Sequence, residues 1–240
     1  MVNPMNKTVV NKMDKKQFIK QIKGRLIVSC QALEGEPLYG SETMAKMANA
    51  AEAGGAVAIR ANGGSDIAAI KNVTILPIIG LVKRVYKDSK VYITPTKKEI
   101  DELMEVGVDV IAIDMTNRSR PNGESLADLI DFMKKRNQLV LADISTLEEG
   151  LEAVRLGADF ISTTLSGYTD YTKRNTSKPD VALVEQLAKA INIPVIAEGR
   201  IHTPQQAKEM LQKGAISVVV GSAITRPQLI TKSFVEELSD

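Results

Sequence analysis

Aromatic residues are scarce in this chain of 240 residues: they make up 4% of it, and tryptophan is absent. Proteins that stack nucleic-acid bases or sugar rings depend on aromatic side chains, so the composition supports neither mode of binding. The charge is also nearly balanced, with 31 Lys and Arg against 29 Asp and Glu. Because nucleic-acid-binding domains carry a strongly basic surface, nucleic acid is not an expected partner.

The chain has one cysteine, Cys30, and one histidine, His202. A lone cysteine cannot form an intramolecular disulfide, which is typical of proteins in the reducing cytoplasm. A lone histidine excludes a metal site built from several imidazoles. Acidic residues alone could hold Mg²⁺, but here they alternate with Lys and Arg, so we expect no metal. We interpret Cys30 as a core residue and His202 as a surface or loop-packing residue.

Long hydrophobic runs are also missing. No apolar stretch approaches the ~20 residues that span a bilayer, and the first residues lack the apolar core of a signal peptide. We therefore expect no membrane partner and a cytoplasmic location. Hydrophobic residues still make up 44% of the chain, enough for the core of one large domain.

A repeat of glycine followed by a buried strand runs through the chain with a spacing of roughly 50 residues. The four glycines are Gly55, Gly107, Gly157 and Gly214. Four more apolar runs fall between these units: Leu26–Ser29, Pro77–Val82, Leu139–Ala142 and Pro194–Ala197. Eight strands that alternate with amphipathic segments predict a closed (β/α)8 TIM barrel. An open doubly wound sheet is the alternative, but no GxGxxG follows the first strand.

We expect residues 24–240 to form this barrel as a single domain. Residues 1–23 lie outside the repeat, and the first 13 are polar and unpatterned, which indicates a partly disordered extension. Within Asp14–Lys23, three apolar residues, Phe18, Ile19 and Ile22, share one helical face. This spacing predicts a short helix that closes the barrel at the end where the strands begin.

Charged and polar residues gather where the predicted strands end. They include Gln31, Arg60, Lys83, Arg84, Asp114, Asp143, Thr163, Thr164 and Glu198. The active sites of TIM barrels lie at this end, and so many ionisable groups favour a functional site over a network of structural ion pairs. Asp114 is a weaker candidate for a site residue than Asp143, because it can pair with Arg118 or Arg120 in its own loop.

Lys83 closes an apolar strand close to Arg60 and Arg84. Burial and like charge should lower its pKa, which would suit a base near neutral pH or a Schiff-base nucleophile. The alternative is a lysine at the barrel rim that pairs with a carboxylate. Glu198 is either the complementary acid or an anchor for a substrate hydroxyl.

The last two strands are followed by Gly199-Arg200 and Gly221-Ser222. In TIM barrels the loops after strands seven and eight often hold a phosphate. Glycine lets the backbone approach the ligand closely, and free N–H groups favour an anion. The sequence therefore predicts a phosphorylated small molecule, bound by the backbone of these four residues.

Eight segments, in order, resemble the N-acetylmannosamine-6-phosphate 2-epimerases. They are Ile27–Ala32, Ala58–Asn62, Leu76–Arg84, Tyr92–Thr96, Asp143–Thr146, Ser162–Thr169, Glu198–Ile201 and Ala223–Pro227. The resemblance covers the chain from about residue 24 to the end. Asp114-Met115-Thr116 departs slightly from the Asp-Ala-Thr expected there. The resemblance implies a (β/α)8 barrel, no metal or organic cofactor, a homodimer, and a place in bacterial sialic acid breakdown.

The family's catalytic lysine and glutamate fall on Lys83 and Glu198. Its substrate contacts fall on Gln31, Arg60, Asp143 and Arg226. The implied reaction interconverts N-acetylmannosamine 6-phosphate and N-acetylglucosamine 6-phosphate by moving a proton at C2 of the ring-opened sugar. Two alternatives remain open at this stage. One is another sugar-phosphate isomerase or a Schiff-base aldolase, and the other is a non-catalytic metabolite sensor.

Overall fold

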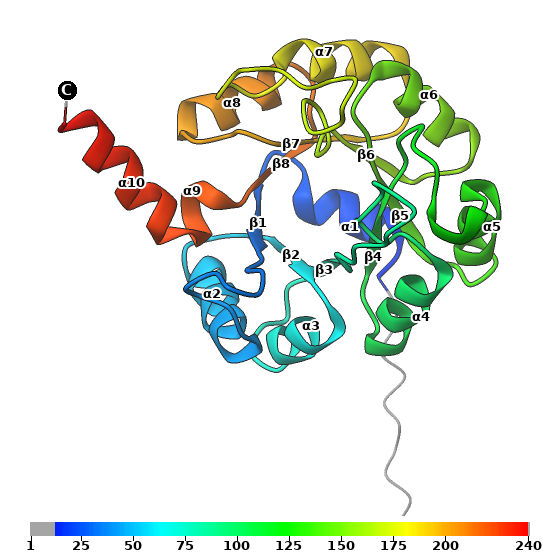
Figure 1. The fold of residues 1–240 in the computed structure, drawn as a ribbon, viewed down its shortest axis with the longest axis horizontal. Helices are drawn as coiled ribbons and strands as arrows, with labels where there is room; N and C mark the ends of the chain where they lie inside the picture. Colours follow the sequence, from blue (N-terminus) through cyan, green and yellow to red (C-terminus); the bar gives the residue numbers. More distant parts are fainter. Residues whose placement is uncertain (1–12, 240) are drawn as a thin grey trace, which may run out of the picture.

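Eight parallel strands close into a barrel in the computed structural model, which describes residues 13–239 (Figure 1). The strands pair in chain order, and β8 pairs with β1 to complete the circle. They are β1 (Leu26–Cys30), β2 (Ala58–Asn62), β3 (Ile78–Leu81), β4 (Val110–Asp114), β5 (Leu139–Asp143), β6 (Phe160–Ser162), β7 (Val195–Glu198) and β8 (Ser217–Val220). The predicted (β/α)8 barrel is confirmed, and the open sheet is wrong.

Helices surround this barrel. They are α2 (Ser41–Ala53), α3 (Gly64–Lys71), α4 (Lys97–Val106), α5 (Leu126–Lys134), α6 (Leu147–Arg155), α7 (Val181–Ala190) and α8 (Pro204–Gln212), which follow β1 to β7 in turn. A short α9 (Ser222–Thr225) and α10 (Pro227–Glu237) follow β8, and α10 extends away from the barrel (Figure 1). Between residues 13 and 239, no helix is both long and apolar enough to cross a membrane.

The four repeated glycines share one backbone conformation. Gly55, Gly107, Gly157 and Gly214 have φ angles of 93°, 75°, 94° and 105°. Side chains disfavour this left-handed region, so glycine is the residue that ends each helix and redirects the chain into the next strand. These strands are β2, β4, β6 and β8, so the repeat read in the sequence marks every second strand of the barrel.

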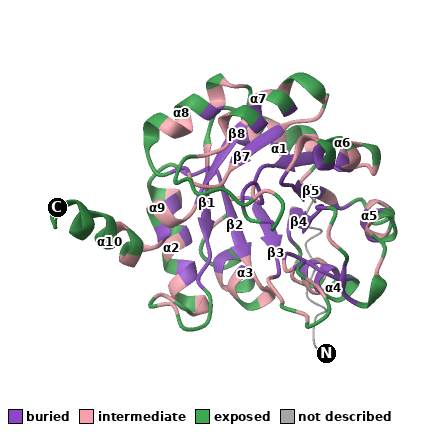
Figure 2. Ribbon diagram, turned by 45° about the horizontal axis from the view of Figure 1, so that its top comes forward, coloured by how far each residue is buried: buried purple, intermediate pink, exposed green. Residues whose placement is uncertain are grey.

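The strands are buried on both faces (Figure 2). One apolar layer lies between the strands and the helices, and another fills the barrel interior. The helix α1 (Lys15–Ile22) belongs to the inner layer, where Phe18 and Ile22 are fully buried. The Phe18 ring meets the Phe160 ring edge to face, with their centroids 5.2 Å apart. The helix expected at the strand-start end is therefore confirmed, whereas the disorder expected before it falls on residues 1–12, outside the described residues.

Replacing Phe18 with alanine should lower the free energy of unfolding by about 3–5 kcal/mol, because it removes a fully buried ring and leaves a cavity against Phe160. Urea unfolding followed by circular dichroism measures the change. Lys16→Ala, at an exposed position of the same helix, is the matched control. Equal unfolding midpoints for the two variants would show that α1 does not contribute to the core.

Candidate active site

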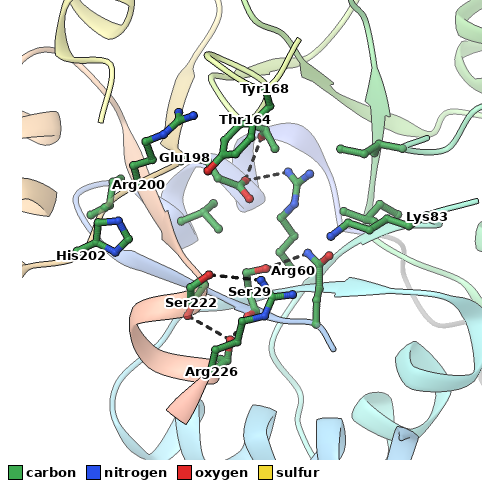
Figure 3. A pocket seen from close by; sticks show the side chains of 18 of the residues that line it. Ser29, Arg60, Lys83, Thr164, Tyr168, Glu198, Arg200, His202, Ser222 and Arg226 are labelled. Carbon is green, nitrogen blue, oxygen red and sulfur yellow. Dashed lines mark hydrogen bonds and ion pairs between the residues drawn. The ribbon is translucent and has the colours of Figure 1, made fainter. Parts of the chain in front are cut away.

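A cavity of about 300 Å³ opens at the carboxyl ends of the strands. Its size falls at the lower end of the range for small-molecule sites. Nine of the ten residues predicted from the sequence line it: Gln31, Arg60, Lys83, Glu198, Gly199, Arg200, Gly221, Ser222 and Arg226. Figure 3 shows Arg60 between Glu198 and Lys83, and Ser222 with Arg226 on another wall. The structure thus brings together side chains from both halves of the chain.

Arg60 on β2 is the largest buried polar side chain of the site and is only 1% exposed. Its Nη1 and Nη2 donate to the Asp143 carboxylate over 3.0 and 2.5 Å, and Nη1 also lies 3.0 Å from Glu198 Oε2. Burial alone would lower the pKa of Arg60, but the two carboxylates outweigh it and raise that pKa above its usual range. The guanidinium therefore stays charged inside the barrel.

Asp143 at the end of β5 is fully buried and does not line the cavity. Arg60 binds both of its oxygens, and Thr164 Oγ1 lies 2.6 Å from Oδ1. Asp143 thus lies behind Arg60, as seen from the cavity. It acts on the site by pairing with the Arg60 guanidinium and holding it in position. This placement differs from the direct substrate contact expected from the sequence.

Glu198 ends β7 and reaches the cavity, with its side chain 15% exposed. Burial raises the pKa of Glu198, the charge of Arg60 lowers it, and the neighbouring Asp143 raises it again. The net direction is upward, so Glu198 is protonated more readily than an exposed carboxyl group. A carboxyl group at a cavity wall can act as an acid or a base toward a bound ligand.

Lys83 lies two residues beyond β3, and its backbone N–H donates to Asn62 Oδ1 over 2.7 Å. Burial, followed by the charges of Arg60 and Arg226, lowers the pKa of Lys83 to about 8. In the part of the chain that the structure describes, its ammonium group makes no ion pair. The predicted lowering is confirmed, with Arg226 in place of Arg84 as the second main cationic cause. Arg84 pairs with Glu99 and Glu102 of α4 instead.

The predicted phosphate loops lie together on the cavity wall. Gly199 has a φ of 107°, and a Cβ on Gly221 would lie 3.3 Å from Ser29 Cβ, so glycine keeps both backbones accessible. The Arg200 guanidinium donates to the carbonyls of Ser166 and Gly167 and lies 4.0 Å from the Tyr168 ring centre. The Arg200 side chain therefore fixes the loop after β6, so an anion in this cavity would meet the backbone of Arg200.

Several cavity residues were not predicted as site residues from the sequence, among them Tyr92, Tyr168 and His202. His202 is exposed, as expected, and its ring also lines the cavity beside Arg200 and Ser222 (Figure 3). Its position four residues after Glu198 was the only signal available. Tyr168 lies in one of the resembling segments, but nothing in the local pattern shows that its ring would stack on Arg200.

Other sequence interpretations concern residues outside the cavity. Asp114 pairs with Arg118 over 2.5 Å, as predicted for its own loop. Cys30 is a buried core residue, and burial raises the pKa of its thiol to about 12, so it is not an activated nucleophile. Among residues 13–239, no group of three or more His, Cys, Asp or Glu side chains could hold a metal ion.

Residues 44–240 match the family model described as N-acetylmannosamine-6-phosphate epimerase. A relative from Clostridium perfringens, named N-acetylmannosamine-6-phosphate 2-epimerase, is 58% identical over 217 residues, which cover 90% of this chain and 98% of the relative. A relative of the same name from Clostridioides difficile is 56% identical and is covered to 99%.

The solved structure of the Clostridium perfringens N-acetylmannosamine-6-phosphate 2-epimerase superposes with a TM-score of 0.89 at 56% identity, over 91% of this chain and 95% of that chain. A thiamine phosphate pyrophosphorylase from Pyrococcus furiosus, 18% identical with a TM-score of 0.58, shares the fold alone. Similarity over nearly the whole length, both in sequence and in structure, decides the family. The chain belongs to the N-acetylmannosamine-6-phosphate 2-epimerases.

Proposed function

We propose that this protein interconverts N-acetylmannosamine 6-phosphate and N-acetylglucosamine 6-phosphate by removing and returning the proton at C2. The activity for which its relatives are named supports this substrate. The observation that carries the chemistry is the Lys83 amine, whose pKa is lowered to about 8 and which lines the same cavity as Glu198 and Arg60.

The C2 proton of an N-acetylhexosamine is acidic only when C1 is an open-chain aldehyde. Neutral Lys83 takes this proton, and the negative charge that develops on the aldehyde oxygen is stabilised by the fixed charge of Arg60. A proton from solvent then adds to the opposite face of C2 and gives the other epimer, and the Lys83 ammonium releases its proton to solvent, which restores the neutral amine. Because Arg60 is already paired and buried, its charge needs no reorganisation during the reaction.

Ring opening must come before this step, and we assign it to Glu198. The hemiacetal loses its O1 proton, the C1–O5 bond breaks, and O5 gains a proton. The Glu198 carboxylate, whose raised pKa makes it a better proton acceptor than an exposed carboxylate, can carry that proton from one oxygen to the other. Gln31 holds the sugar in this arrangement. Its buried Oε1 has no hydrogen-bond partner among the described residues, so it can accept a substrate N–H or O–H.

The 6-phosphate binds to the backbone of Gly199, Arg200, Gly221 and Ser222. Arg226 supports this end of the cavity with a side chain that pairs with Glu36 over 2.9 Å and lies 3.4 Å from Ser222 Oγ. A phosphate fixed at one end places C1 and C2 of the sugar toward Glu198 and Lys83.

We also propose a cytoplasmic place in sialic acid breakdown, since phosphorylated sugars are retained inside cells, and a homodimer. Support for the dimer comes from α10, which the structure describes in full and which buries none of its side chains. Phe234, Val235 and Leu238 are 67%, 57% and 86% exposed there. An apolar face of this kind favours association with a second copy.

Lys83→Ala should lower the exchange of the C2 proton with deuterated water by 10²-fold or more, because the variant has no base. In the wild type, activity should rise with pH through about 8, because only the neutral amine accepts a proton. Proton NMR of the sugar phosphate measures the exchange. Lys87→Ala, at an exposed position of the same loop, serves as the control.

Exchange that persists in Lys83→Ala would show that another group is the base. Borohydride added with substrate separates this mechanism from an aldolase, since a lysine that only transfers protons forms no reducible Schiff base. A stable adduct on Lys83 would contradict the proposed role. If the wild-type protein bound the sugar phosphate but did not exchange its C2 proton, the result would favour a non-catalytic metabolite sensor.

Gly221→Val should raise the KM for N-acetylmannosamine 6-phosphate about tenfold or more, because its side chain would point toward Ser29 and occupy the phosphate end of the cavity. Unphosphorylated N-acetylmannosamine serves as the internal control. It should be a poor substrate for both proteins, and the substitution should change its turnover little. If the wild type turned over both sugars equally well, these loops would not be a phosphate site.

Sedimentation at micromolar concentration should show a species of twice the 26.1 kDa chain mass. Phe234→Glu should shift it toward the monomer, because the substitution introduces a charge into the apolar face of α10. Lys232→Glu places the same charge on the opposite side of the helix and should leave the dimer intact. A wild type that sediments only as the single chain would contradict the proposal.

A further inference from the structure

Two carboxylates of the site share two hydrogen-bond donors. Arg60 Nη1 lies 3.0 Å from both Asp143 Oδ1 and Glu198 Oε2. Thr164 Oγ1 lies 2.6 and 3.2 Å from the same two oxygens. Thr164 follows β6, and Figure 3 shows it beside Glu198. The hydroxyl of Thr164, like Nη1 of Arg60, therefore lies within hydrogen-bond distance of both carboxylates.

A hydroxyl group carries one hydrogen and two acceptor positions. Ser162 Oγ, which lies 2.7 Å from Thr164 Oγ1, can donate to it and leave the Thr164 hydrogen for a carboxylate. The shorter distance indicates that the Thr164 hydroxyl donates to Asp143 Oδ1 in this arrangement. The hydroxyl can rotate and donate to Glu198 Oε2 when that group is ionised. Among the described residues, Thr164 is thus the neutral donor within reach of both carboxylates.

The contacts of Glu198 are asymmetric. Oε2 is held by Arg60 and Thr164, whereas Oε1 has no hydrogen bond to any side chain or backbone group between residues 13 and 239. The carboxyl group lines the cavity, so Oε1 is the oxygen left to meet a sugar. The Glu198 backbone is fixed separately, by Thr163 Oγ1 over 2.9 and 3.1 Å.

We propose that Thr164 is a positioning residue for Glu198: its hydroxyl holds Oε2 against Arg60, favours the ionised carboxylate, and leaves Oε1 to take the O1 proton of the sugar. This inference rests on the ring-opening role proposed for Glu198. It assigns Thr164 no contact with the reacting atoms. During ring opening the proton moves from O1 to Oε1 and then to O5, and the hydrogen of Thr164 stays on its own oxygen.

Other charges also act on Glu198. Asp143 opposes its ionisation, while Arg60 and Lys83 favour it. The remaining titratable or charged side chains on the cavity wall are Tyr92, Tyr168, Arg200, His202 and Arg226. A change confined to the Thr164 hydroxyl leaves all of these in place. Its effect on the protonation of Glu198 can therefore be measured separately from theirs.

The test measures ring opening alone. Exchange NMR reports how fast the enzyme interconverts the α and β anomers of N-acetylmannosamine 6-phosphate, and a Lys83→Ala background removes the C2 step. Adding Thr164→Val to that background should lower the rate at neutral pH about tenfold or more. It should also move the midpoint of the rise in rate with pH upward by about one unit, because the ionised carboxylate loses a donor.

Thr164→Ser keeps the hydroxyl and should restore both the rate and the midpoint. Thr176→Val makes the same chemical change at an exposed position of the same loop and should alter neither. If Thr164→Val does not fold, as judged by circular dichroism, the smaller Thr164→Ala replaces it. An unchanged pH midpoint, or a serine variant as impaired as the valine variant, would overturn the proposal.

These results also separate the two proposals. Wild-type protein that exchanges no C2 proton of the sugar phosphate contradicts the proposed function. Wild-type protein that exchanges it, together with Thr164 variants whose anomer exchange matches that of the Lys83→Ala parent, contradicts only the role of Thr164.

Discussion

The site depends on one buried cation. Arg60 on β2 binds Asp143 on β5 and Glu198 on β7, so its guanidinium joins three strands across the interior of the barrel. A charge in this position is tolerated only when it is paired. The same charge lowers the pKa of Lys83 and opposes the rise in the pKa of Glu198. One residue therefore connects the strands of the site and acts on the pKa of both Lys83 and Glu198.

Much of the fold was predictable because it follows from local chemistry. The left-handed glycines and the buried apolar runs are properties of short segments, and parallel strands bring their carboxyl ends to one edge. Lys83 and Glu198 were accessible to the same reasoning, because each charged side chain closes an apolar strand. The phosphate loops were indicated by glycines directly after β7 and β8.

The rest depends on distances across the barrel, which no local pattern contains. Asp143 and Glu198 both end strands, yet one lies behind Arg60 and the other reaches the cavity. Arg84 follows Lys83 directly, but its side chain pairs with Glu99 of α4. Arg226 lies far along the chain, yet its charge lowers the pKa of Lys83. His202 and Tyr168 line the cavity because the loops after β7 and β6 fold over its mouth. Side-chain direction and the packing of distant loops decided these cases.

The position of α1 determines at which end of the barrel the two sugars enter and leave. Phe18 and Ile22 fill the strand-start end of the barrel in the part of the chain that the structure describes, so a ligand reaches the interior through the mouth lined by Lys83 and Glu198. The two epimers differ only at C2 and carry the same phosphate. They therefore compete for the same entrance and for the same proposed phosphate-binding loops. A catalyst lowers the barrier equally in both directions, so it leaves the equilibrium between the two sugars unchanged. Net flow follows whichever epimer the surrounding metabolism removes faster.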